Sequence, residues 1–370
     1  MSGSSGELSV RLKPFDQLSP TELERWEEFR GGRPEYRSPF FSVRFSQAVH
    51  RVRQDVEVAV VTNGDRPVGF LPLHRIGRRA FPAGRFLNDA HNVISSPDVT
   101  IDWFWLLEQL PIASFDFHAL VGEDSGSFPE HTCHETVRSF RCEIGEDPVA
   151  YLAGLSHNHK TIGRQNQKTR KLAREVGEVT FEFDCRSPEL LRQAIQWKRD
   201  QYHRTSILDL FVPDWTRQLM EELFSGAGTD LSTRNEPRGI LSVLRAGEHI
   251  VAMHYGLLEQ GLLHYWFPAY DPRFSRYSPG TALFRKILEQ AGQNQLNCID
   301  MGYGEQPYKL KQTDAVGEVA QGCLTNSAVY RHYRCAGTHA ASILRQVPGK
   351  EAFKWMYRKL LPTAGMSKLK

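Results

Sequence analysis

A weak internal repeat is the feature that most constrains the fold of this 370-residue chain. The segment AVVTNGDRPVGFLPLH (59–74) and the segment SVLRAGEHIVAMHYGL (242–257) each have the pattern of two apolar strands joined by a tight turn. Gly64 in the first turn corresponds to Gly247 in the second, and an acidic residue follows each glycine. Glycine suits such a turn because it adopts positive φ angles without steric cost.

The correspondence continues beyond the two hairpins at the same offset of 183 residues. Ser95 corresponds to Ser278, and each serine precedes an apolar-periodic helix and then a short strand. The repeat therefore predicts two copies of one α/β unit, over about residues 8–145 and 179–335.

The second copy has the clearer pattern of elements. We expect a helix over 279–291, and strands at 239–244, 250–259, 262–269 and 297–301. Such a mixture needs a central sheet with covering helices. The predicted class is α/β (α+β), with two tandem units, each a mixed, mostly antiparallel sheet flanked by helices.

Three segments lie outside the two units. Residues 1–7 are expected to be flexible, and residues 336–370 contain an amphipathic helix that docks on the protein itself or touches a membrane peripherally. Residues 146–178 are expected to connect the units as a basic amphipathic helix. That helix is either solvated or anion-binding along one basic stripe, which consists of His157, Lys160, Arg164, Lys168 and Lys171.

Composition narrows the class of protein. Hydrophobic residues make up 40% and charged residues 24%, which is typical of a soluble globular protein, and the net charge of +3 is too small to indicate nucleic acid as a partner. There is no apolar signal-peptide core and no stretch long enough for a transmembrane helix. The six scattered cysteines contain no CxxC pair, which favours a reducing, cytoplasmic location. The cluster HTCHETVRSFRC fits no standard zinc spacing, so no metal is predicted.

Three stretches of the chain resemble a known family. They are HNHKTIGRQNQKTRKL (157–172), FPAYDPRFSRYSPGTALFRKIL (267–288) and IDMGYGEQPYKLK (299–311). The chain is similar, over about residues 10–335, to GNAT-superfamily acyltransferases of the cellulose-biosynthesis-associated (CelD-like) family. That family is similar in turn to the Fem-type transferases, which carry two GNAT-like units. The resemblance implies acyl transfer from acetyl-CoA or another acyl-CoA to an amine or hydroxyl.

The chain departs from the usual GNAT pattern at one point. The pyrophosphate loop of typical members, Gln/Arg-x-x-Gly-x-Gly/Ala, is represented here only by YSPGT. Fem-type relatives use aminoacyl-tRNA in place of CoA. The identity of the donor therefore stays open at this point.

The segment SPGT begins the predicted helix of the second copy and is a candidate cofactor site. The first turn of a helix has unpaired N–H groups and a partial positive charge, which suits a pyrophosphate. Pro279 sets the helical φ angle, Gly280 lets a ligand approach, and Ser278 either caps the helix or binds phosphate. Thr281 and, one turn on, Arg285 complete the predicted set.

The candidate catalytic residues come from two strands. Asp300 and Glu305 flank the two glycines of MGYGE and offer carboxylates that deprotonate the acceptor. Tyr308 is the candidate proton donor to the leaving thiolate, a part that a tyrosine plays in many GNAT enzymes. In the implied fold, the strand that contains His254 splays to bind pantetheine, and His254 is a candidate base or a packed residue.

Five residues are candidates for contact with the acceptor. Lys309 suits an anionic acceptor or a donor phosphate, and Trp266 and Tyr270 either stack on a sugar or belong to the core. Lys160 and Arg164 of the basic stripe face the same region in this interpretation.

Three functions remain open from the sequence. The first is an acyl-CoA-dependent N- or O-acyltransferase with a small-molecule or glycan acceptor, with polysaccharide or cell-envelope biosynthesis implied by the resemblance alone. The second is a Fem-like aminoacyl-tRNA-dependent transferase, in which the basic helix holds RNA. The third is a non-catalytic polyanion-binding or scaffold protein, which needs neither Tyr308 nor Glu305.

Overall fold

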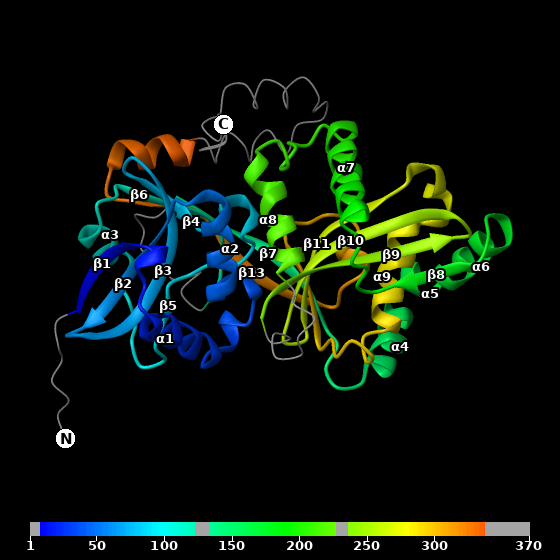
Figure 1. The fold of residues 1–370 in the computed structure, drawn as a ribbon, viewed down its shortest axis with the longest axis horizontal. Coiled ribbons are helices and arrows are strands. Elements are labelled where there is room, and N and C mark those ends of the chain that lie inside the picture. Colours follow the sequence, from blue (N-terminus) through cyan, green and yellow to red (C-terminus); the bar gives the residue numbers. More distant parts are fainter. Residues whose placement is uncertain (1–7, 123–132, 227–235, 337–370) are drawn as a thin grey trace. The chain divides into compact units, whose positions relative to one another are not determined.

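The computed structural model describes residues 8–122, 133–226 and 236–336. The described residues form two compact units, and each is discontinuous in sequence. Of the described residues, unit 1 consists of 8–29, 55–122, 133–136 and 320–336, and unit 2 consists of 30–54, 137–226 and 236–319. Each unit has mixed sheet and helices, so the predicted α/β class is confirmed (Figure 1).

Unit 1 is built on strands in the order β1-β2-β3-β4-β6, with β5 paired to β3. The final residues of β13 pair with β6, antiparallel. Its elements are β1 (Leu8–Pro14), most of α1 (Pro20–Gly31), β2 (Val56–Asn63), β3 (Arg66–Ile76), β4 (Arg79–Pro82), β5 (Ile94–Ser95), α3 (Trp103–Gln109), β6 (Ser114–Leu120) and the end of β13 (Ala315–Thr325).

Unit 2 is built on strands in the order β7-β12-β11-β10-β9-β8. The elements that its residues form are α2 (Val43–Arg53), most of β7 (Cys133–Glu143), α4 (Pro148–Asn158), α5 (Lys160–Gly163), α6 (Gln165–Glu175), β8 (Val179–Glu182), α7 (Pro188–Arg204), α8 (Asp214–Ser225), β9 (Arg238–Ala246), β10 (His249–Glu259), β11 (Leu262–Tyr270), α9 (Pro279–Glu289), β12 (Cys298–Tyr303) and the start of β13.

The two hairpins that the repeat predicts are confirmed. In unit 1, β2 and β3 pair antiparallel around Gly64, and in unit 2, β9 and β10 pair antiparallel around Gly247. The φ angles of these glycines are 60° and 53°, in the left-handed region that favours glycine. The strand and helix order predicted for the second copy is also found in unit 2.

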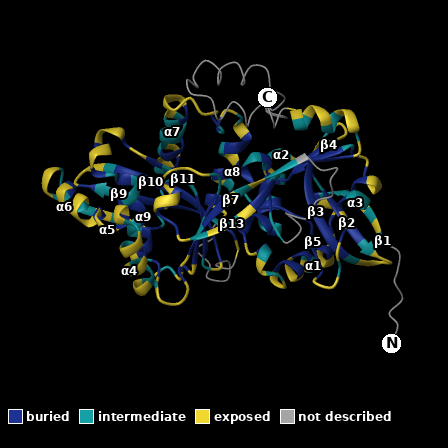
Figure 2. Cartoon of the chain, turned by 180° about the vertical axis from the view of Figure 1, so that it is seen from behind, coloured by how far each residue is buried: buried dark blue, intermediate teal, exposed yellow. Residues whose placement is uncertain are grey.

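Helices cover both faces of the unit 2 sheet. The Tyr255 hydroxyl donates a hydrogen bond to the Met220 carbonyl of α8, at 2.9 Å. The adjacent His254 stacks on Tyr265, and Tyr265 packs edge-on against Phe284 of α9. Because successive strand residues point to opposite faces, α8 and α9 lie on opposite sides. Figure 2 shows strands β10 and β11 as mostly buried and the outer faces of the helices as exposed.

One pair of strands in unit 2 separates partway along its length. Strands β11 and β12 run parallel, but their register pairs extend only from Leu262–Cys298 to His264–Asp300. Beyond that point β11 continues to Tyr270 and β12 continues to Tyr303. We call the region where these two strands are no longer paired the strand split. The sequence interpretation placed the splayed strand at β10, but in the structure it is β11 that parts from its neighbour.

Residues 30–54 belong to unit 2, although they lie within the range predicted for the N-terminal unit. The aromatic ring of Phe40 packs edge-on against His264 and Trp266 of β11. In Figure 1, α2 lies beside α8, and Arg51 of α2 forms an ion pair with Glu222 of α8. Apolar packing over a long sequence separation determines this grouping, and the linear pattern does not reveal it.

The predicted single basic helix is three short helices in the structure, α4, α5 and α6. His159 has extended dihedral angles and interrupts the first two. Gly163 lies so close to the Ser156 carbonyl that a Cβ atom would meet it at 2.6 Å. This tight approach needs glycine and folds the segment back on itself.

Two further predictions concern the ends of the chain and membranes. The amphipathic tail over 336–370 lies almost entirely outside the described residues. In the part of the chain that the structure describes, no helix is long and apolar enough to cross a membrane.

Candidate active site

The start of α9 is held in a conformation that favours anion binding. A 3₁₀ turn, Pro272–Tyr277, leads to Ser278, whose φ and ψ angles are 53° and 58°, in the left-handed region. Serine rarely adopts this conformation, and such strain is commonly found at functional sites. The Ser278 side chain does not cap the helix; its Oγ accepts a hydrogen bond from Lys168 Nζ at 2.8 Å. No side chain at the N-cap therefore satisfies the first N–H groups of α9.

Space and charge at this helix start both suit a phosphate. A Cβ atom at Gly280 would have Tyr270 Cδ1 as its nearest neighbour, at 3.9 Å, so the backbone is approachable. The ammonium of Lys168 on α6 adds positive charge to the positive end of the helix dipole. The structure thus brings Ser278 and Gly280 of the predicted cofactor site together with Lys168 of the predicted basic stripe.

The segment predicted as a basic helix, now α4 to α6, contacts the region of α9 through its buried residues. Gln165 Nε2 donates to the Tyr277 carbonyl at 2.9 Å, which fixes α6 beside the helix start. The predicted residues Lys160 and Arg164 are exposed. Arg285 instead donates to the Ile162 carbonyl at 2.9 Å and pairs with Glu289, so its guanidinium links α5 to α9.

The segment that follows β12 lies against the same helix start. Gln312 Nε2 donates to Thr281 Oγ1 at 3.1 Å, and Gln312 directly follows the 3₁₀ turn Lys309–Lys311. Lys309 is buried, and its Nζ donates to the carbonyl of Tyr303, the last residue of β12, at 2.6 Å. These contacts bring the Tyr-Lys sequence to the strand split beside α9.

Tyr308 lies at the edge of this region. The residue is 36% exposed, so part of it is in contact with solvent. Burial raises the pKa of Tyr265, and the neighbouring Tyr308 raises it further, which places Tyr308 near the first β11 residue beyond the pairing. A phenol next to the strand split is a candidate proton donor.

The two predicted carboxylates differ in their surroundings. Asp300 Oδ1 accepts a hydrogen bond from the Gly302 amide at 2.7 Å, and Arg141 lies 4.0 Å from Oδ2. Glu305 is exposed and accepts a hydrogen bond from Arg138 at 3.2 Å. Asp300 belongs to the last register pair of β11 with β12, and Glu305 follows that pair in the sequence.

His254 is fully buried and stacked on Tyr265 with 4.0 Å between ring centroids. Burial, together with the charges of His264 and Lys198, lowers its pKa well below the usual range. Neither ring nitrogen has a hydrogen-bond partner in the structure. A neutral, enclosed imidazole of low basicity is poorly suited to accept a proton from an acceptor, so the role of His254 stays a prediction.

The two aromatic candidates, Trp266 and Tyr270, have different surroundings. Trp266 is partly buried and packs on Phe40 and Phe267, at 5.3 and 5.0 Å between ring centroids. Tyr270 is 37% exposed and lies next to Gly280. Of the pair, Tyr270 is therefore the one that borders the helix start.

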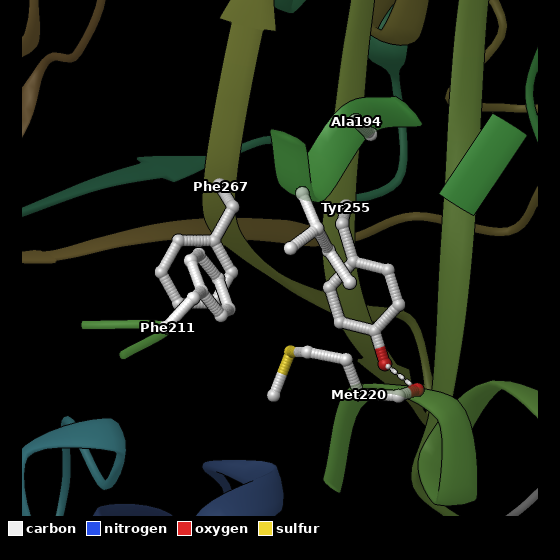
Figure 3. Close-up of a pocket in the computed structure, with 6 residues that line it drawn as sticks. Ala194, Phe211, Met220, Tyr255 and Phe267 are labelled. Atoms are coloured by element: carbon white, nitrogen blue, oxygen red, sulfur yellow. Dashed lines mark hydrogen bonds between the residues drawn. The ribbon is translucent and has the colours of Figure 1, made fainter. Parts of the chain in front are cut away.

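An apolar pocket lies on the α7 and α8 side of the sheet. The space inside it that a water molecule can occupy is about 10 Å³, room for about one water. In Figure 3 the Tyr255 hydroxyl points to the Met220 carbonyl, and that hydrogen bond is already made. The pocket therefore offers apolar surface without reactive groups, and its lining consists of Ala194, Ile195, Phe211, Met220, Tyr255 and Phe267.

Lys198 is the site residue that the sequence interpretation missed. It lies on α7, its Nζ donates to the Pro268 carbonyl of β11 at 3.1 Å, and its ammonium lies 5.3 Å from the centroid of the Tyr202 ring. Burial and the nearby Lys309 lower the pKa of Lys198 to about 8. The available signal was a lysine on the apolar face of an amphipathic helix, four residues after buried Ala194 and four before Tyr202.

No three His, Cys, Asp or Glu side chains among the described residues are grouped to hold a metal ion. The chemistry that this arrangement offers is anion binding at the start of α9, with a phenol, two carboxylates and two lysines around the adjacent strand split.

Comparison with known proteins supports this interpretation of unit 2. Residues 163–310 match the family model described as Acetyltransferase (GNAT) domain. No curated protein matches the chain. The solved structure of FemX is similar, with a TM-score of 0.54 and 9% identity over 84% of this chain and 98% of FemX.

Two other solved structures have comparable folds. One is the C-terminal domain of a protein from Agrobacterium fabrum described as a lysylphosphatidylglycerol synthetase, with a TM-score of 0.51 and 12% identity over 89% of this chain and 98% of that one. The other is a conserved protein of unknown function from Bacteroides thetaiotaomicron, with a TM-score of 0.52 and 11% identity over 85% of this chain and 100% of that one. At these identities the likeness concerns the fold alone. Residues 163–310 thus match the GNAT acetyltransferase domain model, in a chain whose fold is similar to that of FemX.

Proposed function

We propose that the protein transfers an acyl group from acyl-CoA to an amine or hydroxyl acceptor, with the pyrophosphate of CoA at the start of α9. The observation that carries this proposal is the uncapped, left-handed Ser278 beside Lys168 and the open Gly280. Pantetheine then enters the strand split, where β11 no longer pairs with β12. The match to a GNAT domain over 163–310 supports the same class of reaction.

The proposed reaction needs one base and one acid. The acceptor nitrogen or oxygen attacks the thioester carbonyl, forms a bond to carbon, and passes its proton to Asp300 or Glu305. The carbon–sulfur bond then breaks, and Tyr308 gives its proton to the leaving thiolate. N–H groups at the splayed strand stabilise the oxyanion between these steps.

Calorimetric titration of acetyl-CoA tests the site. We expect saturable binding that Gly280→Trp abolishes, because the indole would occupy the space before the helix start. Gly154→Trp is a matched control, since Gly154 lies on α4, is exposed, and a Cβ atom added there would meet no atom within 4 Å. Undiminished binding to a folded Gly280→Trp protein would place CoA elsewhere.

The contribution of the Lys168 charge to acetyl-CoA binding is tested by the same titration. Lys168→Met is expected to weaken acetyl-CoA about tenfold, which corresponds to losing one charge-assisted hydrogen bond. Lys171→Met is the control, because Lys171 lies three residues on and pairs with Glu175 at 3.7 Å. Equal affinities of the two variants would argue against pyrophosphate at Ser278.

An aminoacyl-tRNA-dependent transferase is the second candidate. The exposed basic residues of α5 and α6, and the similarity of the fold to FemX, favour it. RNA binding with a steep salt dependence, together with no affinity for any CoA species, would support this function over the first. A role in polysaccharide biosynthesis, of the kind implied by the CelD-like resemblance, belongs to the same proposal and is tested by a screen of glycan acceptors.

A further inference from the structure

Helices α4, α5 and α6 form one layer on unit 2. Their buried residues Leu155, Ile162 and Leu172 belong to the same apolar cluster as Phe284 and Leu288 of α9. Because the three helices bury their apolar residues in one cluster, their exposed faces point away from that cluster. Figure 2 shows much of α4, α5 and α6 as exposed. We call these exposed faces together the α4–α6 surface.

The α5 and α6 part of this surface is strongly cationic. Residues 148–174 contain no aspartate or glutamate, and their six lysines and arginines are all exposed: Lys160, Arg164, Lys168, Arg170, Lys171 and Arg174. Among the residues that the structure describes, one of the six, Lys171, pairs with a carboxylate, that of Glu175 at 3.7 Å. Glu175 also pairs with Arg276, at 3.0 Å. Ion pairs among the described residues therefore leave most of this positive charge without compensation.

The α4 part of the surface is uncharged. Helix α4 contains no lysine, arginine, aspartate or glutamate, and its exposed residues over the first two turns are Val149, Ala150, Ala153 and Gly154. The Asp147 carboxylate caps the helix by accepting hydrogen bonds from the Val149 and Ala150 amides, at 3.1 and 2.9 Å. Val149 is 80% exposed at this capped helix start. A single exposed apolar side chain is common, but this one lies on an uncharged helix face beside six cations.

An uncharged helix face beside a cationic one suits the surface of a membrane. Apolar side chains enter the boundary between headgroups and acyl chains, while lysines and arginines attract anionic headgroups. A nucleic acid would meet the cations but would leave the α4 face in water. A second copy of this chain, placed on the same surface about a two-fold axis, would bring like charges together. Charge and apolar exposure together therefore favour a lipid partner.

We propose that the α4–α6 surface binds the surface of a membrane that contains anionic phospholipids. The association is peripheral and reversible, with the side chains of α4 in the headgroup region and the cations of α5 and α6 against the lipid phosphates. This inference goes beyond the proposed acyl transfer and does not depend on CoA binding.

Vesicle sedimentation of the full-length protein tests the proposal without requiring turnover. The vesicles consist of phosphatidylcholine alone, or of phosphatidylcholine and phosphatidylserine at about three to one. We expect partitioning to the mixed vesicles to be at least about tenfold stronger, and to weaken in about 1 M NaCl, which screens exposed charges. Equal partitioning to the two kinds of vesicle, or none to either, would overturn the proposal.

A double substitution assigns the binding to α5 and α6. Lys160→Gln with Arg164→Gln should weaken partitioning about 25-fold, since each neutralised cation near an anionic surface accounts for about fivefold. The matched control is Arg192→Gln with Arg204→Gln, which removes the same charge from exposed positions on α7, on the other side of the sheet. Binding that survives in the folded first variant, or that falls equally in both, would refute the assignment.

A substitution on α4 separates a membrane from other polyanions. Val149→Asp should weaken partitioning about tenfold, because it replaces an apolar side chain with an anion at the lipid surface. An acid in the first turn is compatible with the helix, so folding is preserved. Val212→Asp is the control, because Val212 is 60% exposed just before α8, and this variant should bind as wild type does. Equal binding of the two variants would contradict insertion of α4.

Titration with a transfer RNA distinguishes the remaining partner. If the protein binds RNA but not mixed vesicles, and the double substitution at Lys160 and Arg164 abolishes RNA binding while Val149→Asp does not, the surface serves a nucleic acid and the membrane proposal is overturned. Vesicle binding that is lost in both the double variant and Val149→Asp supports the membrane, whether or not any CoA species binds.

Discussion

The predicted role of Tyr308 as proton donor can be tested by a substitution that should not affect folding. Its side chain is 36% exposed at the edge of the strand split, so removing the hydroxyl leaves no buried gap. We expect Tyr308→Phe to lower kcat about 100-fold, the lower range of general acid catalysis, and to leave the affinity for acetyl-CoA unchanged. Steady-state kinetics beside calorimetry would measure both. An unchanged kcat would remove Tyr308 from the chemistry.

Lys198 predicts a pH dependence of stability. Its pKa in the folded protein, about 8, lies below the usual 10.5, so the unfolded chain binds more protons between these two pH values. Stability relative to Lys198→Met should therefore rise with pH through that window, by about 3 kcal/mol. The other groups that act on Lys198 are Lys309 and the neutral His254, and neither supplies a negative charge.

Urea unfolding of wild type and Lys198→Met between pH 7.5 and about 10.5 measures this difference, since the groups common to both proteins cancel. A difference that falls with pH would mean that Lys198 is stabilised as a cation and has an acidic neighbour.

At the scale of elements, β10 ends in a buried ion pair that holds the segment around residues 30–54 to unit 2. The Glu259 carboxylate accepts from both terminal nitrogens of Arg30, and Arg30 also donates to the Tyr36 carbonyl at 3.2 Å. Side-chain exposures of 8% for Arg30 and 2% for Glu259 show that the ion pair is shielded from bulk solvent.

Glu259→Gln should consequently lower the free energy of unfolding by about 3 kcal/mol, because a neutral amide replaces the carboxylate that accepts two hydrogen bonds from the buried Arg30 guanidinium. Chemical denaturation measures this loss. Glu248→Gln, at the exposed turn before the same strand, serves as the control and should change stability by less than about 0.5 kcal/mol. Similar effects of the two substitutions would show that the ion pair contributes no more than a surface charge.

Elements also show where sequence patterns were sufficient. The sequence predicted tight turns at the hairpin glycines and a helix from the apolar periodicity of 279–289, and the structure confirms both. Both features depend only on residues that are close in the sequence. The break of the basic segment at His159 and Gly163 was not predicted, because it depends on a close approach of Gly163 to the Ser156 carbonyl. A helical pattern that is locally continuous does not reveal such a fold-back.

At the scale of the whole molecule, the matched GNAT region is smaller than the unit that contains it. Unit 2 also needs residues 30–54, and Phe40, Phe41 and Phe45 from that segment are almost fully buried. We expect a fragment of residues 137–319 alone to be poorly folded, since each exposed phenylalanine would forfeit roughly 2–3 kcal/mol of burial. Circular dichroism and calorimetric melting of the fragment, compared with the full chain, check this. A cooperative transition in the fragment would show that residues 30–54 are dispensable for unit 2.

The sequence by itself determined the two-copy α/β class, the hairpins, and the junction of strand and helix at Ser278, because turn chemistry and apolar periodicity are local properties. Only the tertiary structure decided which charges meet. Lys168 contacts Ser278, which is 110 residues away in the sequence, and Lys198 and Lys309 donate hydrogen bonds to backbone carbonyls of β11 and β12. Contacts between residues that are distant in sequence depend on how side chains pack across the sheet, which no local pattern encodes.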